Sequence, residues 1–397
     1  MYIFYLLLGI GLVGLASSTV FLFLTIFGAL KFQRDARRAK ASSPQDSDLP
    51  AVSLLKPVHG LDARLKENVE SFYLQHYGDY EILFAADTDD DPALAVVREI
   101  AARYPKIPTR ILVNGKPPWP NPPAWSFHCM EQIAAYNILV TSDSDVEVQP
   151  DYLRQVVAPL LDPKVGMLTC VYRGKNAGGF WSGMDAIGMS VEMTSGVLVA
   201  NMLEGMKFGL GPTIVVRRDS LEKIGGYEGI GDYFANDFVI GNFIEKAGYK
   251  VVLSEHIIDH VVPPMTFKKM WERQVRWAKS TRYSRPKGHF GTGLIFSVPY
   301  GILAFLGMAG LGHPGVGAAL FGGAVLNRMV ECLVAGWAVV RDPRVLRSPW
   351  LYPIRDLLGF IVWCASYLSK GSVWRDNTYK LLEGGRIVRQ TPAVTNK

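Results

Sequence analysis

Residues 51–262 alternate short apolar runs with segments of helical periodicity, and no other feature constrains the fold of this chain as strongly. A repeated strand–helix order needs crossover connections, which produce a parallel sheet covered by helices on both faces. We therefore predict an α/β domain built on a mainly parallel sheet. The predicted strands are 52–55, 80–86, 110–113, 138–140, 213–216 and 250–253, and the predicted helices are 62–76, 92–102 and 126–136.

Asp143 and Asp145 follow directly on the apolar run 136–142. In an α/β sheet the carboxyl ends of the strands open on the ligand crevice. Two carboxylates one residue apart can bind one hard cation, Mg²⁺ or Mn²⁺, which keeps positions for phosphate oxygens. An Asp-x-Asp pair alone is a weak signal, because most such pairs are solvated turn residues. Its meaning therefore depends on what else the chain brings to the same edge of the sheet.

Further charged and aromatic residues follow in order along the chain. Taken singly, each has an ordinary explanation: a helix cap for an aspartate, a lipid-facing charge for an arginine, an interface anchor for a tryptophan. Their joint order favours one common site. These residues are Asp87, which ends the predicted strand 80–86, Asp237 in segment 232–238, and Arg273, Arg276 and Trp277 directly before the C-terminal apolar segments.

The N-terminal residues 2–30 contain no charged side chain and are long enough to cross a bilayer. A basic cluster follows, and the positive-inside rule then places the N-terminus outside and the next domain in the cytoplasm. A cleaved signal peptide is the alternative, but the run is too long for one and no basic residue precedes it. The cluster consists of Lys31, Arg34, Arg37, Arg38 and Lys40.

The C-terminal part begins with a basic segment, 266–287, whose apolar residues recur at helical spacing. This pattern is typical of an amphipathic helix on a membrane surface, although a solvated basic helix has the same pattern. Apolar stretches follow at 291–312, 316–340 and 354–369. The first two are predicted to span as a pair. The third is shorter, and a span there would put the basic tail outside, so we predict a re-entrant or interfacial segment.

Charge and cysteine content argue against nucleic-acid binding, a disulfide framework and a zinc site. The net charge is +6, and the basic residues lie near apolar segments, so they are expected to face anionic lipid rather than nucleic acid. The four cysteines show no CxxC spacing, which predicts neither a disulfide framework nor a zinc site.

The ordered carboxylates and the RxxRW segment 273–277 resemble the inverting, family-2-like glycosyltransferases with a GT-A fold. The chain is most similar to the ceramide glucosyltransferase family, family 21, whose pattern is D, D, D, (Q/R)xxRW. The resemblance covers nearly the whole chain and includes segments 56–60 and 225–227. Bacterial hopanoid-biosynthesis glycosyltransferases are similar too, especially around 119–121 and 203–206.

The resemblance implies a role for each candidate residue. Asp143 and Asp145 would hold a divalent cation, Mn²⁺ or Mg²⁺, on the diphosphate of a nucleotide-sugar donor. Asp87 would accept hydrogen bonds from the uracil or the ribose. Asp237 would be the general base that takes the proton of the acceptor hydroxyl. On the segment 273–277, Arg273 and Arg276 would contact the departing diphosphate, and Trp277 would pack beside the sugar or the acceptor's entry.

The sequence departs from the family pattern at some positions. Pro123 stands where related transferases often carry a lysine, so a diphosphate contact is lost or comes from another residue such as Lys116. Asn236 stands where an acidic residue often precedes the base, which should make Asp237 easier to ionise, other things equal. Asp145 restores the general Asp-x-Asp form at a position where some ceramide glucosyltransferases carry glycine.

We therefore predict a metal-dependent, inverting glycosyltransferase that moves a hexose from a UDP-sugar to the hydroxyl of a membrane lipid. UDP-glucose and ceramide are the expected substrates. The alternatives are a hopanoid acceptor with UDP-N-acetylglucosamine, a processive polysaccharide synthase and a non-catalytic membrane scaffold. The synthase usually needs more spanning helices than this chain offers.

The predicted organisation places an integral protein in the membrane, the inner membrane if the source is bacterial, with the catalytic domain facing the cytoplasm. Transmembrane helices are expected at both ends of the chain. The predicted segments are an N-terminal transmembrane helix at 1–32, a basic linker at 33–50, a GT-A catalytic domain at 51–262, an interfacial segment at 263–290, membrane segments at 291–370 and a cytosolic tail at 371–397.

Overall fold

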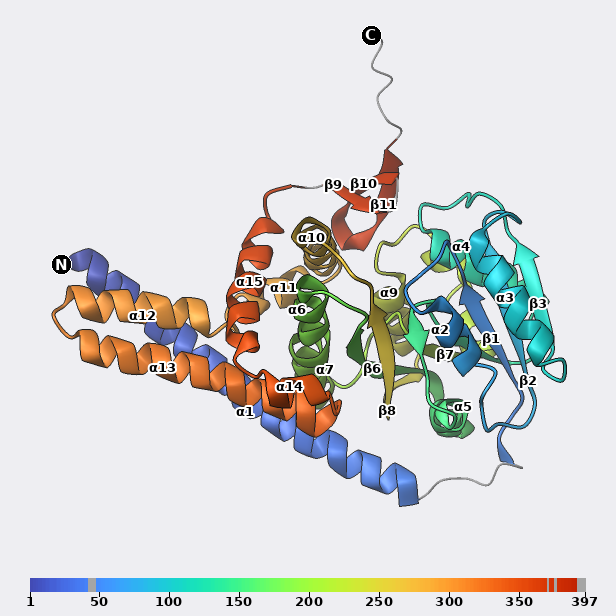
Figure 1. Cartoon of the computed structure of the whole chain (residues 1–397), viewed down its shortest axis with the longest axis horizontal. Coiled ribbons are helices and arrows are strands. Elements are labelled where there is room, and N and C mark those ends of the chain that lie inside the picture. The colour runs from blue at the N-terminus through green and yellow to red at the C-terminus, as the bar shows by residue number, and fades with distance from the viewer. Residues whose placement is uncertain (42–47, 370, 375–376, 391–397) are drawn as a thin grey trace, which may run out of the picture.

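A computed structural model describes residues 1–41, 48–369, 371–374 and 377–390. Within these residues the chain forms an α/β body, a helical bundle that projects from it and a small C-terminal sheet (Figure 1). The predicted linker positions 42–47 and tail positions 391–397 lie outside the described residues.

The body is built on a sheet of eight described strands in the order β3-β2-β1-β4-β7-β6-β8-β5. Four of the seven described pairings are parallel, and β7 runs antiparallel to both β4 and β6. The sheet is therefore mixed. The strands are β1 (Val52–Pro57), β2 (Tyr80–Ala86), β3 (Thr109–Val113), β4 (Ile138–Thr141), β5 (Val146–Glu147), β6 (Val165–Asn176), β7 (Ile214–Arg217) and β8 (Lys250–Val262).

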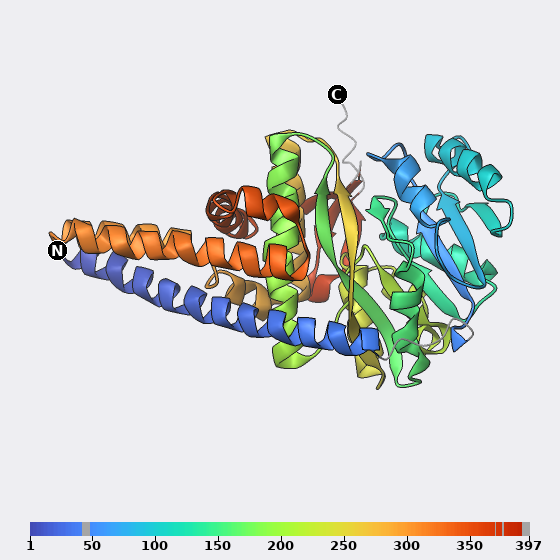
Figure 2. The same ribbon diagram turned by 60° about the horizontal axis from the view of Figure 1, so that its bottom comes forward.

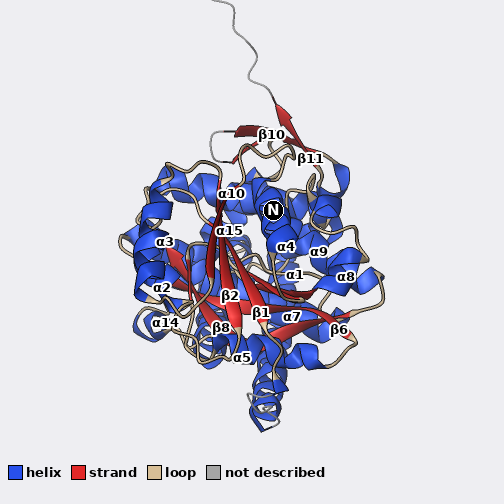
Figure 3. Cartoon of the chain, turned by 90° about the vertical axis from the view of Figure 1, so that its right-hand side faces the viewer, coloured by secondary structure: helices blue, strands red, loops and turns tan. Residues whose placement is uncertain are grey.

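Helices cover both faces of this sheet (Figure 3). Successive residues of a strand point to opposite faces, so Leu54 belongs to one hydrophobic cluster and Leu55 to the other. The first cluster packs under α2 (Leu65–Ser71), α3 (Pro92–Arg103) and α5 (Tyr152–Val157). The second packs under α4 (Pro122–Ile133), α8 (Arg218–Glu222) and α9 (Asn236–Lys246).

The projecting bundle consists of α1 (Tyr2–Ala41), α12 (Val298–Gly310) and α13 (Pro314–Glu331), which continues as the π-helical turn η5 (Cys332–Val339) (Figures 1 and 2). Glycines allow α1 and α12 to approach closely. A Cβ on Gly11 would lie 2.6 Å from the backbone nitrogen of Ala304, and a Cβ on Gly307 would lie 2.7 Å from that of Leu8. Small residues at such contacts are typical of helix pairs in membranes.

Among the described residues, three helical segments are long and apolar enough to cross a membrane: 2–41, 180–204 and 314–339. The expected span at 291–312 is shorter than predicted, because α12 begins only at Val298 and has 13 residues. Long apolar helices therefore lie near the N-terminus and internally, and the expectation of membrane helices at both ends is corrected to that extent. The sequence analysis did not predict a membrane-length helix at 180–204, and 61% of its apolar window is buried in the protein.

That internal segment comprises α6 (Phe180–Gly188), a π-helical turn η3 (Met189–Met193) and α7 (Thr194–Glu204). The chain therefore leaves β6 through one long helix and returns as β7 beside β4 and β6, running antiparallel to both. A parallel crossover is absent at this point, which explains why the sheet is mixed.

The C-terminal residues form α14 (Pro343–Arg347), α15 (Leu351–Ala365) and a three-stranded sheet. In Figure 1, α15 lies across the bundle rather than along it. The predicted tail contains the strands β9 (Gly371–Trp374), β10 (Asn377–Leu381) and β11 (Ile387–Gln390).

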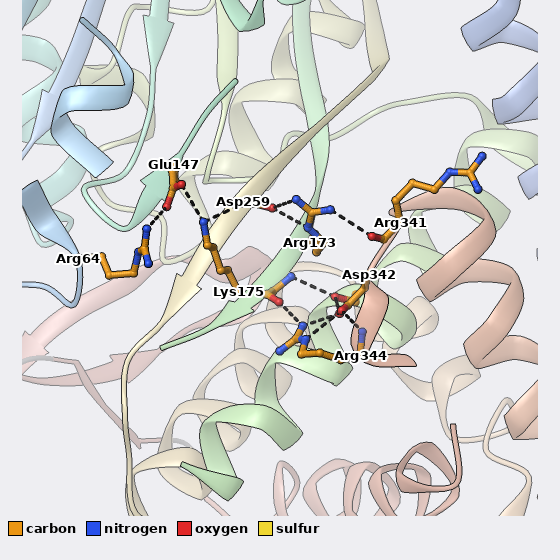
Figure 4. A network of polar contacts seen from close by, with 10 residues as sticks. Arg64, Glu147, Arg173, Lys175, Asp259, Arg341, Asp342 and Arg344 are labelled. Atoms are coloured by element: carbon orange, nitrogen blue, oxygen red, sulfur yellow. Dashed lines mark hydrogen bonds and ion pairs between the residues drawn. The ribbon is translucent and has the colours of Figure 1, made fainter. Parts of the chain in front are cut away.

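A polar network joins the sheet to the end of the bundle (Figure 4). Arg173 on β6 pairs with Asp259 on β8 at 2.6 Å and donates to the carbonyl oxygen of Arg341 at 3.2 Å. Lys175 pairs with Glu147 at 2.7 Å on the strand after the Asp-x-Asp segment. The hydrogen bond from Arg173 to Arg341 therefore links the body to the end of the helix that ends at residue 339.

Candidate active site

The predicted site residues meet at one edge of the sheet. Asp87 directly follows β2 and Asp143 follows β4 by two residues, and β1 lies between these parallel strands. Their carboxyl ends therefore share an edge. A cavity of about 1210 Å³ opens there, and all seven predicted residues line it: Asp87, Asp143, Asp145, Asp237, Arg273, Arg276 and Trp277.

Asp237 lies in the first turn of α9 and is held by backbone donors. The N–H of Gly211 donates to Oδ2 at 3.0 Å, and the N–H of Phe238 donates to Oδ1 at 2.8 Å. A Cβ on Gly211 would lie 3.4 Å from this Oδ2 and 3.7 Å from Oδ2 of Asp143. Because Gly211 has no side chain, open space remains beside the carboxylates of Asp237 and Asp143.

Burial raises the pKa of Asp237, and the two backbone hydrogen bonds offset this only in part. The expected easing of ionisation by Asn236 is therefore outweighed by desolvation of the carboxylate. A base with a raised pKa binds a proton more strongly, which suits proton abstraction from a hydroxyl.

Asp145 fits a hard cation. Its Oδ1 is buried and has no hydrogen-bond partner among the described residues, and its Oδ2 lies 3.3 Å from Nε2 of His260. The described residues hold no group of three or more His, Cys, Asp or Glu side chains placed for a metal. A pair of carboxylates with other positions left to phosphate and water is the usual arrangement for Mg²⁺ with a nucleotide.

The RxxRW segment lies on α10 (Phe267–Ser284), which Thr266 caps by accepting from the N–H of Lys269. Arg273 stacks on Trp277, with its Cζ 4.5 Å from the ring centroid. The predicted segment 266–287 is helical over most of its length, and both arginines of the motif line the cavity.

His260 belongs to this site, although the sequence analysis did not single it out. It lies on β8 opposite Val146, beside Asp145, and its Nε2 is 3.2 Å from Nη2 of Arg273. Burial lowers its pKa, which keeps the ring neutral at neutral pH. Only the antiparallel pairing of β5 with β8 brings His260 to Asp145, so spacing in the sequence gave no signal.

Lys56, the last but one residue of β1, is a second missed residue. It is fully buried, donates from Nζ to the carbonyl oxygen of Asp143 at 2.8 Å and lies 3.6 Å from the ring centroid of Phe72. Burial lowers its pKa to about 7, while Asp143 and Asp145 act in the opposite direction. This lysine anchors the loop that carries the Asp-x-Asp pair.

The departures from the family pattern also reach the cavity. Pro123 and Asn236 line it, and so do Lys269 and Lys279. Lys116 is not among the described lining residues. Lys279 donates to Ser369 Oγ at 2.6 Å and to the carbonyl oxygen of Gly371 at 2.7 Å, which holds β9 at the cavity.

Solved structures show distant similarity. The mannosyltransferase PcManGT from Pyrobaculum calidifontis, in complex with GDP-Man and Mn²⁺, is 19% identical with a TM-score of 0.47, covering 89% of this chain and 99% of that one. TarS 1–349 of S. aureus, in complex with UDP-GlcNAc, is 13% identical with a TM-score of 0.40, covering 86% and 99%. At such scores neither defines this chain's fold or ligands.

Comparison of the sequence with known proteins shows the family of this chain. Ceramide glucosyltransferase 1 of Caenorhabditis elegans is 27% identical over 347 residues, which is 86% of this chain and 74% of the relative. Ceramide glucosyltransferase 3 of the same organism is 25% identical over 359 residues, which is 87% and 75%. The sequence model of Glycosyl transferase family 21 matches residues 16–387. The chain therefore belongs to glycosyltransferase family 21 and is a glycosyltransferase similar to the ceramide glucosyltransferases.

Proposed function

We propose that this enzyme transfers glucose from UDP-glucose to the primary hydroxyl of ceramide at the cytoplasmic face of a membrane. The observation that carries the proposal is the single cavity that joins a base candidate, Asp237, to the Asp143–Asp145 pair and the two arginines of α10. Similarity to ceramide glucosyltransferases over most of the chain supports the choice of substrates.

On the donor side, the proposal assigns Asp143 and Asp145 to a divalent cation and Asp87 to the uridine. When bound, the cation neutralises charge on the departing diphosphate. Arg273 and Arg276 present guanidinium groups, whose planar fork matches phosphate oxygens. The unpartnered Oδ1 of Asp145 among the described residues supports the metal assignment.

On the acceptor side, Asp237 takes the proton from the attacking hydroxyl. Its two backbone hydrogen bonds fix the carboxylate without neutralising it, and burial raises the pKa of the group. One base acting on the face opposite the leaving group gives inversion at the anomeric carbon. An α-linked UDP-glucose would yield a β-glucoside.

The membrane segments suit an acceptor that stays in the bilayer. Two apolar helices, at 2–41 and 314–339, lie in the projecting bundle, and the cavity lies on the body beside it. A lipid that remains in its leaflet must meet a base held near the interface, and a fixed connection between body and bundle provides this.

The test is lipid glycosylation by the purified protein in detergent. Ceramide and a hopanoid polyol are each offered with UDP-glucose or UDP-N-acetylglucosamine, with Mn²⁺, with Mg²⁺ and with a chelator. We expect metal-dependent glucosylceramide. A glycosylated hopanoid alone would move the enzyme to that acceptor with the same chemistry. A polymer from the donor alone would indicate a polysaccharide synthase, and both of these results would contradict the proposed substrates.

A further inference from the structure

A chain of buried polar contacts runs from the cavity to α15, and it uses residues outside the RxxRW pattern. Arg273 is the cavity end of this chain. Its Nε lies 3.5 Å from Oδ2 of Asp185 on α6, whose side chain is fully buried. From the same edge of the guanidinium, Nη2 reaches Nε2 of His260 at 3.2 Å.

Gln274 continues the chain away from the cavity. Its Nε2 donates to Oδ1 of Asp185, and its Oε1 accepts from Nη2 of Arg355 at 2.7 Å. Arg355 lies on α15, is 2% exposed and also pairs with Glu192 of η3 at 2.9 Å. Two cations and two anions are therefore joined by one neutral amide, so the formal charges of these side chains cancel.

Glycines on two helices shape the slot that holds Arg355. A Cβ on Gly188 would lie 2.6 Å from Nε of Arg355, and a Cβ on Gly359 would lie 3.3 Å from its Nη1. The guanidinium has therefore little freedom to turn. Such a fixed donor can hold Gln274 in one orientation, and through it Asp185.

We infer that Arg355 is a positioning residue for Arg273. Through Gln274 it keeps Asp185 on the Nε/Nη2 edge of Arg273, so that Nη1 of this guanidinium stays turned to the donor diphosphate. The inference rests on the proposed function, because it needs Arg273 to contact the diphosphate. It assigns to α15, a helix of the C-terminal apolar region, a part in donor binding.

The test is a double-mutant cycle on the full-length protein in detergent, with UDP and Mn²⁺ as the probe in calorimetry. Arg355→Met should weaken UDP affinity about tenfold, the scale of one charge-assisted hydrogen bond. Gln274→Met should do the same, and Arg355→Lys should restore part of the affinity. In an Arg273→Lys background, which lacks the Nε that Asp185 contacts, Arg355→Met should change UDP affinity less than about twofold.

Asp356→Asn is the matched control. This neighbour on α15 is also buried, at 3% exposed, and its Oδ2 accepts from the N–H groups of Ser297 and Val298, away from the cavity. We expect it to lower the melting temperature and leave UDP affinity unchanged.

Three results would overturn the inference: unchanged UDP affinity in Arg355→Met, an equal loss with and without Arg273→Lys, or an equal loss in Asp356→Asn. The last two would indicate a general effect on stability. If the unmodified protein binds neither UDP nor a UDP-sugar with Mn²⁺, the proposed function itself fails, and this outcome is distinct from the other three.

Discussion

At the scale of single residues, the environment of Asp237 determines how this carboxylate can act. Two backbone N–H groups orient it, and the absence of a side chain at Gly211 leaves space between it and Asp143. Desolvation raises its pKa, so the carboxylate is a stronger base than an exposed aspartate. The space beside this proposed base therefore depends on a glycine as well as on the acid.

The raised pKa of Asp237 predicts the pH dependence of turnover. As the proposed general base, Asp237 must be ionised, so activity should be lost as pH falls through its pKa. Since the shift is upward, the acid limb of kcat/KM should lie above about 3.9, the ordinary value for aspartate. UDP binding and the melting temperature, followed over the same range, separate this loss from unfolding. An acid limb below pH 4 would contradict the assignment.

Gly211→Ala should reduce turnover while leaving the fold intact. The new methyl group would stand 3.4 Å from Asp237 and 3.7 Å from Asp143, which is ordinary contact, but it would fill the space between them. Misplacement at a reacting centre by about 1 Å can cost on the order of 100-fold in rate. Gly196→Ala, where nothing lies within 4 Å of the added Cβ, is the control. Equal activity of the two variants would show that this space is not used.

At the scale of helices and strands, apolar runs in the sequence predicted several of the strands but not the pairing between strands. The strands at 52–57, 80–86 and 138–141 match apolar runs, and each ends where a carboxylate or Lys56 enters the site. β6 was not predicted, and the position of β7 between β4 and β6 comes from pairing over long sequence distances. His260 and Asp185 reach the site by such pairing and packing, so no spacing rule could find them.

The close contact of α1 with α12 gives a matched pair of variants. Gly11→Val should destabilise the protein in detergent, because its Cβ would lie within 2.9 Å of three atoms of Ala304, two of them backbone. Gly9→Val, on the exposed side of the same helix with nothing within 4 Å, should have no such effect. We expect a melting temperature several degrees lower for Gly11→Val alone, since overpacking costs about 1–3 kcal/mol. Equal melting temperatures would contradict the packing of the bundle.

At the scale of the whole molecule, the projecting bundle carries exposed apolar side chains and the body carries the cavity. α1 has 40 residues, about 60 Å of helix, which is twice the ~30 Å thickness of the hydrocarbon core. The N-terminal part of α1 projects from the body (Figure 2). Its later part packs on the body, where Gly28 lies against Leu198. Exposed apolar residues of the projecting region include Ile3, Leu6, Val13, Val20, Leu306, Val316, Phe321 and Leu326.

This arrangement predicts the topology. In a background with Cys129 and Cys364 changed to serine, Gly315→Cys at the tip of the bundle should react with an impermeant maleimide from outside the cell. Lys106→Cys, an exposed position on the body, should react only after permeabilisation. Labelling of Lys106→Cys in intact cells would contradict a cytoplasmic catalytic body.

The most direct test of the central claim compares Asp237→Asn with the unmodified enzyme in one preparation, measuring both UDP affinity with Mn²⁺ and the rate of lipid glucosylation. The substitution keeps the shape of the side chain and removes the base. We predict unchanged UDP affinity and a rate lower by about 100-fold or more, the usual contribution of a general base. Glucosylation at the normal rate by Asp237→Asn would contradict the account.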